Sequence, residues 1–389
     1  MRQFDCPEFD SCYSEALAYA QKTHEEELGL LRMLAPMPSP SHHEEGRAAV
    51  ICQWLKDHGG AAYIDGANNV ICPIGDDGKK PLVVFAAHTD VVFDDTNPLP
   101  LVEDPDGFTW RCPGAGDDTA NLCNLLMSAK YLLEHPFASD VAFLVVANSC
   151  EEGLGNLYGT RKLFENYGSR VQEYISYDCY AGMCVNHAVG SHRYRISVDT
   201  EGGHSYANFG RPNAIEVLSE IICSLYALEL PKHPKTTCNA GMIEGGTSVN
   251  AIAQHAEMLF EFRSASDGAL EEMDGKLEEV FAAHRNGEVQ VESRQFGLRP
   301  GDGEIDEGKL AALTERSSYA IRKAFGQEVE LSANSTDANI PLSLGIPANT
   351  IGTVRGAGAH TREEWVDTRS LVPGCALALS LMLDYRADA

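Results

Sequence analysis

Apolar residues along the chain recur with two different periods. Spacings of three and four residues, typical of amphipathic helices, predict helices over residues 11–35, 44–58 and 121–133. Short apolar runs predict strands at residues 70–74, 82–87 and 141–147. The last two runs are apolar throughout, as parallel strands buried on both faces are. Because a helix separates these two strands, their order indicates an open α/β sheet.

The pattern changes near residue 190. Residues 193–200 alternate between polar and apolar, which predicts a strand with one buried face. Further periodic segments predict a helix, a strand, a helix and a strand at residues 213–228, 258–263, 268–284 and 289–294. After Pro300 the α/β pattern returns, with a helix over 309–325. We therefore predict a discontinuous α/β domain, residues 1–190 and 299–389, interrupted by a smaller α+β domain, residues 191–298.

Length and charge narrow the possible functions. The chain has 389 residues, more than the roughly 250–300 at which one hydrophobic core stops growing. Lys and Arg number 30 against 57 Asp and Glu, which gives a formal net charge of −27. Such a surface repels phosphate, so we expect neither nucleic acid nor an anionic membrane as a partner.

Cysteines and apolar segments indicate the compartment. The 12 cysteines are scattered and form no Cys-x-x-Cys pair, so no zinc finger or thioredoxin-type site is predicted. The first residues carry no apolar signal segment, and no apolar run approaches the 18 or so residues needed to cross a bilayer. We expect a cytoplasmic protein with reduced thiols.

Acidic residues and histidines follow several of the predicted strands. His88 and Asp90 end the second strand and point the same way, so Asp90 can orient His88. Asp117 and Asp118 follow a glycine-rich loop at a helix entrance, and Glu151 and Glu152 follow the third strand. Asp178 comes after another strand-like run, and His360 lies in a downstream glycine-rich loop. Taken singly, a capped histidine, helix N-caps or surface glutamates explain each of these signals equally well.

Their combination is more specific. Two histidines and several carboxylates at strand ends suit a pair of divalent ions, above all zinc, which takes nitrogen and oxygen ligands. Without a cation, so much clustered negative charge would be very costly to bury. The sequence therefore predicts a two-metal hydrolase.

These motifs in this order resemble the co-catalytic zinc peptidase superfamily, which contains peptidase T, carboxypeptidase G2, the aminoacylases and succinyl-diaminopimelate desuccinylase. The resemblance covers essentially the whole chain. It implies a mixed, largely parallel sheet in the catalytic domain and a ferredoxin-like lid and dimerisation domain. It also implies two metal ions per subunit, zinc first and cobalt or manganese as alternatives. Their ligands would be His88, Asp117 and Asp178 for one ion, and Asp117, Glu152 and His360 for the other.

By the same resemblance, Glu151 is the general base and Asp90 the carboxylate behind His88. His204, in a Gly-Gly-His loop of the inserted domain, would reach the active site of a partner subunit in a homodimer. Asn250 and Arg263 would bind the substrate, although Arg263 can equally be a salt-bridge partner within a strand. A cis peptide bond between Asp117 and Asp118 is also expected.

Two departures refine the functional prediction. The superfamily often has lysine and glycine soon after the bridging aspartate, whereas Asp118, Thr119 and Ala120 follow Asp117 here. Asp178 stands where deacylases usually carry Glu, and Asp337 lies in a segment resembling peptidase T. We predict an aminopeptidase acting on di- and tripeptides. The alternatives are an N-acyl amino acid deacylase or carboxypeptidase of the same superfamily, or an inactive peptide-binding homologue.

Overall fold

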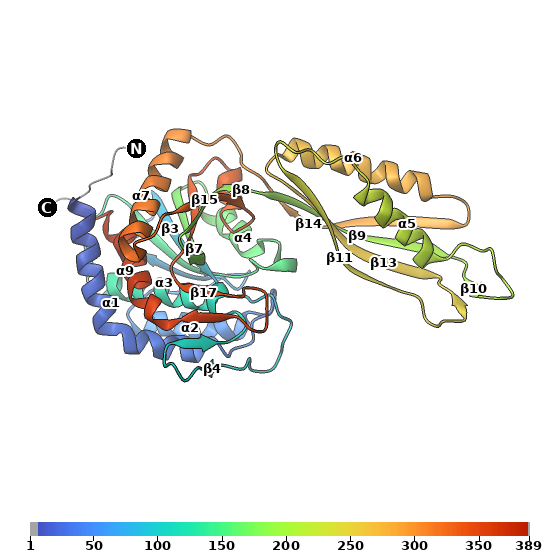
Figure 1. Ribbon diagram of the computed structural model, residues 1–389. Helices are drawn as coiled ribbons and strands as arrows, with labels where there is room; N and C mark the ends of the chain where they lie inside the picture. The colour runs from blue at the N-terminus through green and yellow to red at the C-terminus, as the bar shows by residue number, and fades with distance from the viewer. Residues whose placement is uncertain (1–6, 388–389) are drawn as a thin grey trace. The chain divides into compact units, whose positions relative to one another are not determined.

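The computed structural model describes residues 7–387, which form two compact units (Figure 1). The first unit comprises the residues up to His187 together with those from Gly303 onward, and the second comprises Ala188–Asp302. Within the described residues, no helix is both long enough and apolar enough to cross a membrane.

The first unit is built on an eight-stranded sheet in the order β1-β2-β6-β3-β7-β16-β8-β15. Its strands are β1 Tyr63–Ile64, β2 Val70–Ile74, β3 Leu82–His88, β6 Ala142–Asn148, β7 Val171–Ala181, β8 Met183–Ala188, β15 Glu330–Asn334 and β16 Ala348–Gly352. The central strands β6, β3, β7 and β16 are parallel, whereas β2 and β8 join them antiparallel. The predicted mixed sheet with a parallel centre is therefore confirmed.

Helices cover both faces of this sheet. The long helices are α1 Pro7–Leu34, α2 Glu45–Asp57, α3 Ala120–Glu134, α7 Glu307–Phe325 and α9 Leu371–Leu383. All five contribute to one apolar core together with Phe85 and Ile175 of the sheet. On the opposite face, Phe164 of α4 (Tyr158–Tyr167) packs against Tyr174 of β7 with ring centroids 5.8 Å apart. The central strands are thus buried on both sides, which explains their continuous apolar sequence.

The parallel centre brings several chain segments to one sheet edge. His88, the last residue of β3, is in register with Asn148, the last residue of β6. A small four-stranded sheet is formed by β4 Val102–Glu103, β5 Thr109–Arg111, β17 Arg355–Ala357 and β18 Trp365–Asp367. A short helix, α8 Asn339–Ser343, completes the unit. Ligands of open α/β sheets bind outside the carboxyl ends of the strands, so this edge is where a site is expected.

The second unit is a sheet with two helices on one face (Figure 1). Its antiparallel strands lie in the order β11-β13-β9-β14, with bounds Thr236–Gly245, His255–Ser264, Gly190–Thr200 and Val289–Arg299. The helices α5 Ala214–Tyr226 and α6 Asp267–His284 share an apolar core with these strands. A separate hairpin pairs β10 Gly203–His204 with β12 Ala251–Ile252. This β-α-β-β-α-β order confirms the predicted ferredoxin-like topology.

One strand differs from its predicted extent. Asp178 was expected to follow a strand, but it lies inside β7, which continues to Ala181. The pairing of β7 with β16 shifts register here, because Ile351 is opposite Tyr177 and Gly352 is opposite Ala181. Cys179 has a φ of 75°, a left-handed value that is uncommon for a residue with a side chain. The strand therefore continues through a bulge, and Asp178 lies in it.

Candidate metal centre

Five of the predicted site residues converge in the first unit. They form two groups, in each of which one nitrogen or oxygen atom per residue lies within 4.8 Å of the others. Asp117 belongs to both groups, which are His88, Asp117 and Asp178, and Asp117, Glu152 and His360. The structure thus brings together the same two sets that the resemblance implied.

Each of these side chains is presented by a different segment. His88 ends β3, Asp178 lies in the bulge of β7, and Glu152 follows β6 directly before a 3-10 turn. His360 lies in the loop between β17 and β18 and has a φ of 63°. Asp117 lies in a π-helical turn, Ala115–Thr119, at the entrance to α3. Residues far apart in sequence therefore meet only because the sheet brings their segments to one edge.

The turn that carries Asp117 has an unusual backbone. The Asp117–Asp118 peptide bond is cis, which confirms that prediction. Gly114 precedes it with a φ of 76°, a conformation that favours glycine. A Cβ added at Gly116 would lie 2.7 Å from the ring of Tyr180, so only glycine fits there without displacement. The glycine-rich loop is therefore needed for close packing behind the aspartate.

Asp117 bridges the two histidines. Its Oδ1 lies 3.0 Å from Nε2 of His88, and its Oδ2 lies 3.2 Å from Nε2 of His360. Burial would raise the pKa of Asp117, but the hydrogen bonds from His360 and His88 outweigh burial and hold that pKa below its usual range. The hydrogen bond of His360 to Asp117, followed by its hydrogen bond to Glu152, raises the pKa of His360 to about 11. One carboxylate thus faces both ligand groups, as a bridging ligand must.

The remaining carboxylates are held at an electrostatic cost. Burial, followed by the charge of Asp117, raises the pKa of Asp178 well above its usual value. Burial also raises the pKa of Glu152 to about 7, against the opposing effect of His360. Among the residues the structure describes, Glu152 Oε1 is buried and has no hydrogen-bond partner. Converging imidazole and carboxylate groups with such an unpaired oxygen fit divalent ions of the zinc type.

Asp90 supports this cluster from behind, mainly through the backbone. Its two carboxylate oxygens accept hydrogen bonds from the N–H groups of Glu151, at 3.0 Å, and Glu152, at 2.9 Å. Ser41 Oγ donates to it as well, at 2.7 Å. His88 Nδ1 lies 2.9 Å from the Asp90 carbonyl oxygen and 3.4 Å from Asp90 Oδ1. Asp90 therefore fixes both the imidazole and the turn that carries the two glutamates.

The other three predicted residues lie in the second unit. His204 on β10 pairs with Ala251 of β12, and its Nδ1 accepts a hydrogen bond from the N–H of Tyr206 at 3.2 Å. Asn250, directly before β12, accepts a hydrogen bond from the N–H of Ser205 through its carbonyl oxygen at 3.0 Å. Arg263 lies on β13 and pairs with Glu261 at 2.7 Å, which is the salt bridge considered as its alternative role. His204 and Asn250 are thus neighbours on one hairpin.

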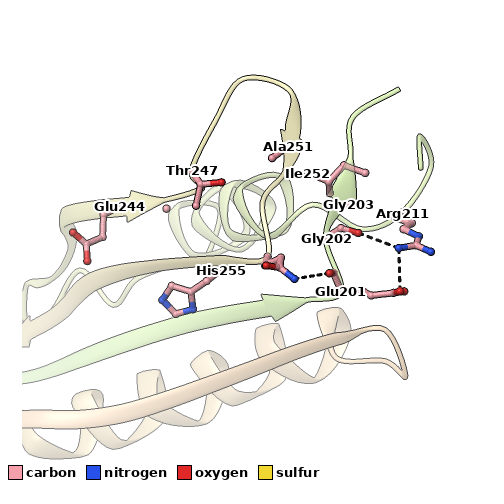
Figure 2. Close-up of a pocket in the computed structure, with 12 residues that line it drawn as sticks. Glu201, Gly202, Gly203, Arg211, Glu244, Thr247, Ala251, Ile252 and His255 are labelled. Atoms are coloured by element: carbon pink, nitrogen blue, oxygen red, sulfur yellow. Dashed lines mark hydrogen bonds and ion pairs between the residues drawn. The ribbon is translucent and has the colours of Figure 1, made fainter. Parts of the chain in front are cut away.

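A cavity of about 760 Å³ lies beside this hairpin (Figure 2). Its lining includes the glycines 202, 203, 245 and 246 and the polar residues Glu201, Arg211, Glu244, Thr247, Gln254 and His255. Arg211 donates to the carbonyl oxygen of Gly202 at 3.2 Å and forms an ion pair with Glu201 at 3.0 Å. The volume is within the usual range of small-ligand sites, and Arg211 fixes the loop that leads to His204.

Sequence reasoning missed Glu364. This buried side chain accepts hydrogen bonds from the N–H groups of Gly114 at 2.6 Å, and of Gly116 and Asp117, each at 2.7 Å. Burial and the charge of Asp117 raise its pKa to about 7, although the three N–H groups lower it. Glu364 therefore ties the segment of His360 to the turn of Asp117. Its position four residues after the predicted ligand His360 was the one sequence feature that could have indicated this role.

Asp337 was noted in the sequence only as part of a motif. It is buried and accepts hydrogen bonds from Thr160 Oγ1, at 2.5 Å, and from the side-chain amide of Asn148. Asn148 ends β6, and Thr160 lies in α4, so these contacts flank the loop that carries Glu151 and Glu152. Asp337 thus connects both ends of that loop.

Comparison with known proteins finds one matching family model and several similar sequences. Residues 186–288 match the family described as the peptidase dimerisation domain. The uncharacterized protein YqjE of Bacillus subtilis (strain 168) is 24% identical over 328 residues, covering 82% of this chain and 84% of that protein. A succinyl-diaminopimelate desuccinylase of Psychrobacter arcticus is 25% identical over 315 residues, covering 75% of each.

Solved structures share the fold along nearly the whole chain. Aminopeptidase PepT from Bacillus cereus ATCC 10987 has a TM-score of 0.70 at 21% identity, covering 94% of this chain and 99% of that one. The YXEP protein of Bacillus subtilis, a dinuclear metal-binding peptidase of the M20 family, has a TM-score of 0.64 at 18% identity, covering 94% and 100%. These likenesses show that the fold is shared.

The three hydrogen bonds to Glu364 lead to a test. Glu364→Gln replaces one acceptor oxygen by a donor, so at least one N–H group of the Asp117 turn loses its partner. We expect divalent-metal affinity to fall about 10–100-fold, the usual effect of losing a group that orients metal ligands. Glu363→Gln is the matched control, because Glu363 is exposed. Titration with zinc in competition with a chelating dye measures the zinc affinity of both variants. Equal affinities of Glu364→Gln and Glu363→Gln would contradict the role assigned to Glu364.

Proposed function

We propose that this chain is a two-metal aminopeptidase acting on short peptides and a member of the superfamily of co-catalytic metal peptidases and deacylases. The observation that carries the proposal is the pair of ligand groups that share Asp117, with Glu151 next to the ligand Glu152. The more general part of this proposal is that the chain is a metal-dependent enzyme that hydrolyses amide bonds. The choice of substrate depends on that part.

The residues of the two groups would hold the metal ions, with Asp117 shared between them. When bound, the pair would lower the pKa of a water molecule towards about 7 and polarise the carbonyl group that is attacked. The donor set of imidazole and carboxylate favours zinc, with cobalt and manganese as alternatives.

Glu151 is proposed as the general base. Its carboxylate would take a proton from the attacking water and pass it to the leaving amine. Its backbone N–H donates to Asp90 at 3.0 Å, so the base is held by the same carboxylate that faces His88. Removal of Glu151 would therefore stop proton transfer while leaving both groups of metal ligands in place.

The preference for free amino ends is supported by two features. By resemblance, Asp178 occupies a position where deacylases and carboxypeptidases usually carry Glu, and Asp337 lies in a segment similar to peptidase T. The structural likeness to the aminopeptidase PepT also supports an aminopeptidase. The second candidate is an N-acyl amino acid deacylase, which is favoured by the similarity to a succinyl-diaminopimelate desuccinylase. An inactive peptide-binding homologue would not need both Glu151 and the full ligand set.

A homodimer with a shared site is also proposed. Residues 186–288 match a peptidase dimerisation domain, and strand β11 is at the edge of its sheet with Met242 and Ile243 exposed. A second copy pairing along this edge would give an isologous interface. By resemblance, His204 would then contribute to the partner's site and stabilise the oxyanion, whereas Asn250 and Arg263 would bind the substrate.

Paired substrates test the reaction. An aminopeptidase should hydrolyse di- and tripeptides with a free amino group faster than the same peptides with an acetylated amino group. The measurement is kcat/KM for both series with zinc-loaded and with cobalt-loaded protein. Faster cleavage of the acetylated series would favour the deacylase, and no cleavage of either series at full metal loading would favour the inactive homologue.

Substitution of the base tests the mechanism. We expect Glu151→Ala to lower kcat by about 10²–10⁴-fold, the usual contribution of a general base, because the proposed mechanism assigns the proton transfer to this carboxylate. Metal content, measured by mass spectrometry after dialysis, should remain that of the unmodified protein. The exposed Glu165→Ala on α4 serves as the control. Unchanged kcat in Glu151→Ala at equal metal content would refute the assignment.

Mixed dimers test whether His204 acts in the partner's site. Glu151→Ala and His204→Ala would be defects in complementary halves of one site, so a mixed dimer has one site with both defects and one with neither. Random pairing makes about half of the dimers mixed, and recovery should approach about a quarter of full activity if the sites are independent. Activity no higher than the mean of the two single variants, with mixed dimers present, would place His204 in its own subunit's site or outside catalysis.

A further inference from the structure

Arg47 on α2 is a fully buried arginine. Its Nη1 donates to the carbonyl oxygen of Thr89 at 2.9 Å and to Oγ1 of Thr119 at 3.3 Å. Its Nη2 donates to the carbonyl oxygens of Leu34, at 3.1 Å, and Met37, at 2.7 Å. Its Nε is buried without a partner in the described part of the chain. None of these four acceptors is a carboxylate, which is unusual for a buried guanidinium.

The acceptors of Arg47 lie next to the metal ligands. Thr89 stands between His88 and Asp90, and Thr119 is two residues beyond Asp117. A single guanidinium group therefore contacts both the strand end that carries one histidine ligand and the turn that carries the bridging aspartate. The contacts to Leu34 and Met37 fix this group to the end of α1.

The charge of Arg47 has a counterpart nearby. Burial lowers the pKa of Arg47 to about 10, so it remains a cation at neutral pH, and Asp90 and Asp118 act in the opposite direction. Asp118 is itself buried and accepts a hydrogen bond from the N–H of His88 at 2.8 Å. A buried guanidinium near these two carboxylates therefore adds positive charge behind the metal ligands.

We propose that Arg47 is a positioning residue of the metal centre, which holds the segments 88–90 and 117–119 together through its guanidinium hydrogen bonds and places a cation near the buried side chains of Asp90 and Asp118. It acts through those segments and touches neither metal nor substrate. The proposal rests on the two-metal site proposed above, but not on the identity of the peptide or acyl substrate.

Thr119 connects this proposal to a departure noted in the sequence. The resemblance noted in the sequence implies a lysine close after the bridging aspartate, where this chain has Thr119 and Ala120. The Thr119 hydroxyl group instead accepts from Arg47 and donates to the carbonyl oxygen of Gly114 at 2.6 Å. The positive charge behind the turn thus comes from α2 in this chain, and not from the turn itself.

The first experiment compares two arginines. Arg47→Met removes the charge and the planar fork while keeping a long apolar side chain. Arg170→Met is the matched control, because Arg170 also donates to a backbone carbonyl, that of Lys80, and pairs with Asp76 beside the start of β7. Zinc affinity by dye competition and unfolding of the metal-free protein in urea are measured for both. We expect zinc affinity to fall about 10–100-fold in Arg47→Met and to stay unchanged in Arg170→Met.

The second experiment relocates the charge. Thr119→Lys introduced into Arg47→Met places an ammonium group at the turn, and we expect at least part of the lost zinc affinity to return. Thr119→Lys alone, which puts two cations together, should bind zinc no better than the unmodified protein. If Arg47→Met does not fold, Arg47→Lys replaces it, since lysine keeps the charge but cannot bridge both segments as a fork does, and a loss of affinity is again expected.

The outcomes separate this inference from the proposed function. If the unmodified protein binds two zinc ions and Arg47→Met binds them equally tightly, Arg47 has no positioning role. If Arg170→Met loses as much affinity as Arg47→Met, the effect is one of general stability and the inference is wrong. If the double variant recovers nothing, the part of the inference that concerns the positive charge is wrong. Failure of the unmodified protein to bind zinc, cobalt or manganese would instead contradict the proposed function.

Discussion

The accumulation of carboxylates at one edge of the parallel sheet is the constraint on which the first unit depends. Asp90, Asp117, Asp118, Glu152 and Asp178 lie there, and burial raises the pKa of three of them, Asp118, Glu152 and Asp178. Negative groups taken out of water must be compensated by cations or by oriented donors. The local architecture of the unit supplies such compensation to one carboxylate after another.

Two kinds of compensation divide the carboxylates by role. Asp90 and Glu364 are supplied with backbone N–H groups, from residues 151 and 152 in one case and from the turn of Asp117 in the other. The metal-ligand candidates instead face imidazole rings and one another across short distances. The supporting carboxylates are therefore satisfied by the fold itself, whereas the ligand candidates need a cation. This difference separates the carboxylates that position the site from the carboxylates that would bind the metal ions.

Much of this organisation could be predicted from the sequence. The periodic helices and the apolar strands 70–74 and 82–87 appear where expected, because periodicity and burial act over a few neighbouring residues. Helix α9 was not predicted, since Leu371–Leu383 is buried on nearly all sides and its almost continuous apolar sequence has no clear period. Strand β11 was missed for the opposite reason, as most of its residues are exposed and too few are buried to show alternation.

The sequence by itself determined the residue types, their order and their place near the ends of strands, and the family resemblance carried by these motifs implied both ligand groups. It did not determine the contacts of Arg47, Glu364 or Asp337, which lie many residues from the segments they support. The hydrogen bonds of Arg47 and Glu364 to backbone groups require no particular partner side chain, and those of Asp337 join side chains far apart in the sequence, so neither kind leaves a motif. Only the tertiary structure brings such a charged group to a distant backbone, so only the structure could reveal which residues hold the site in place.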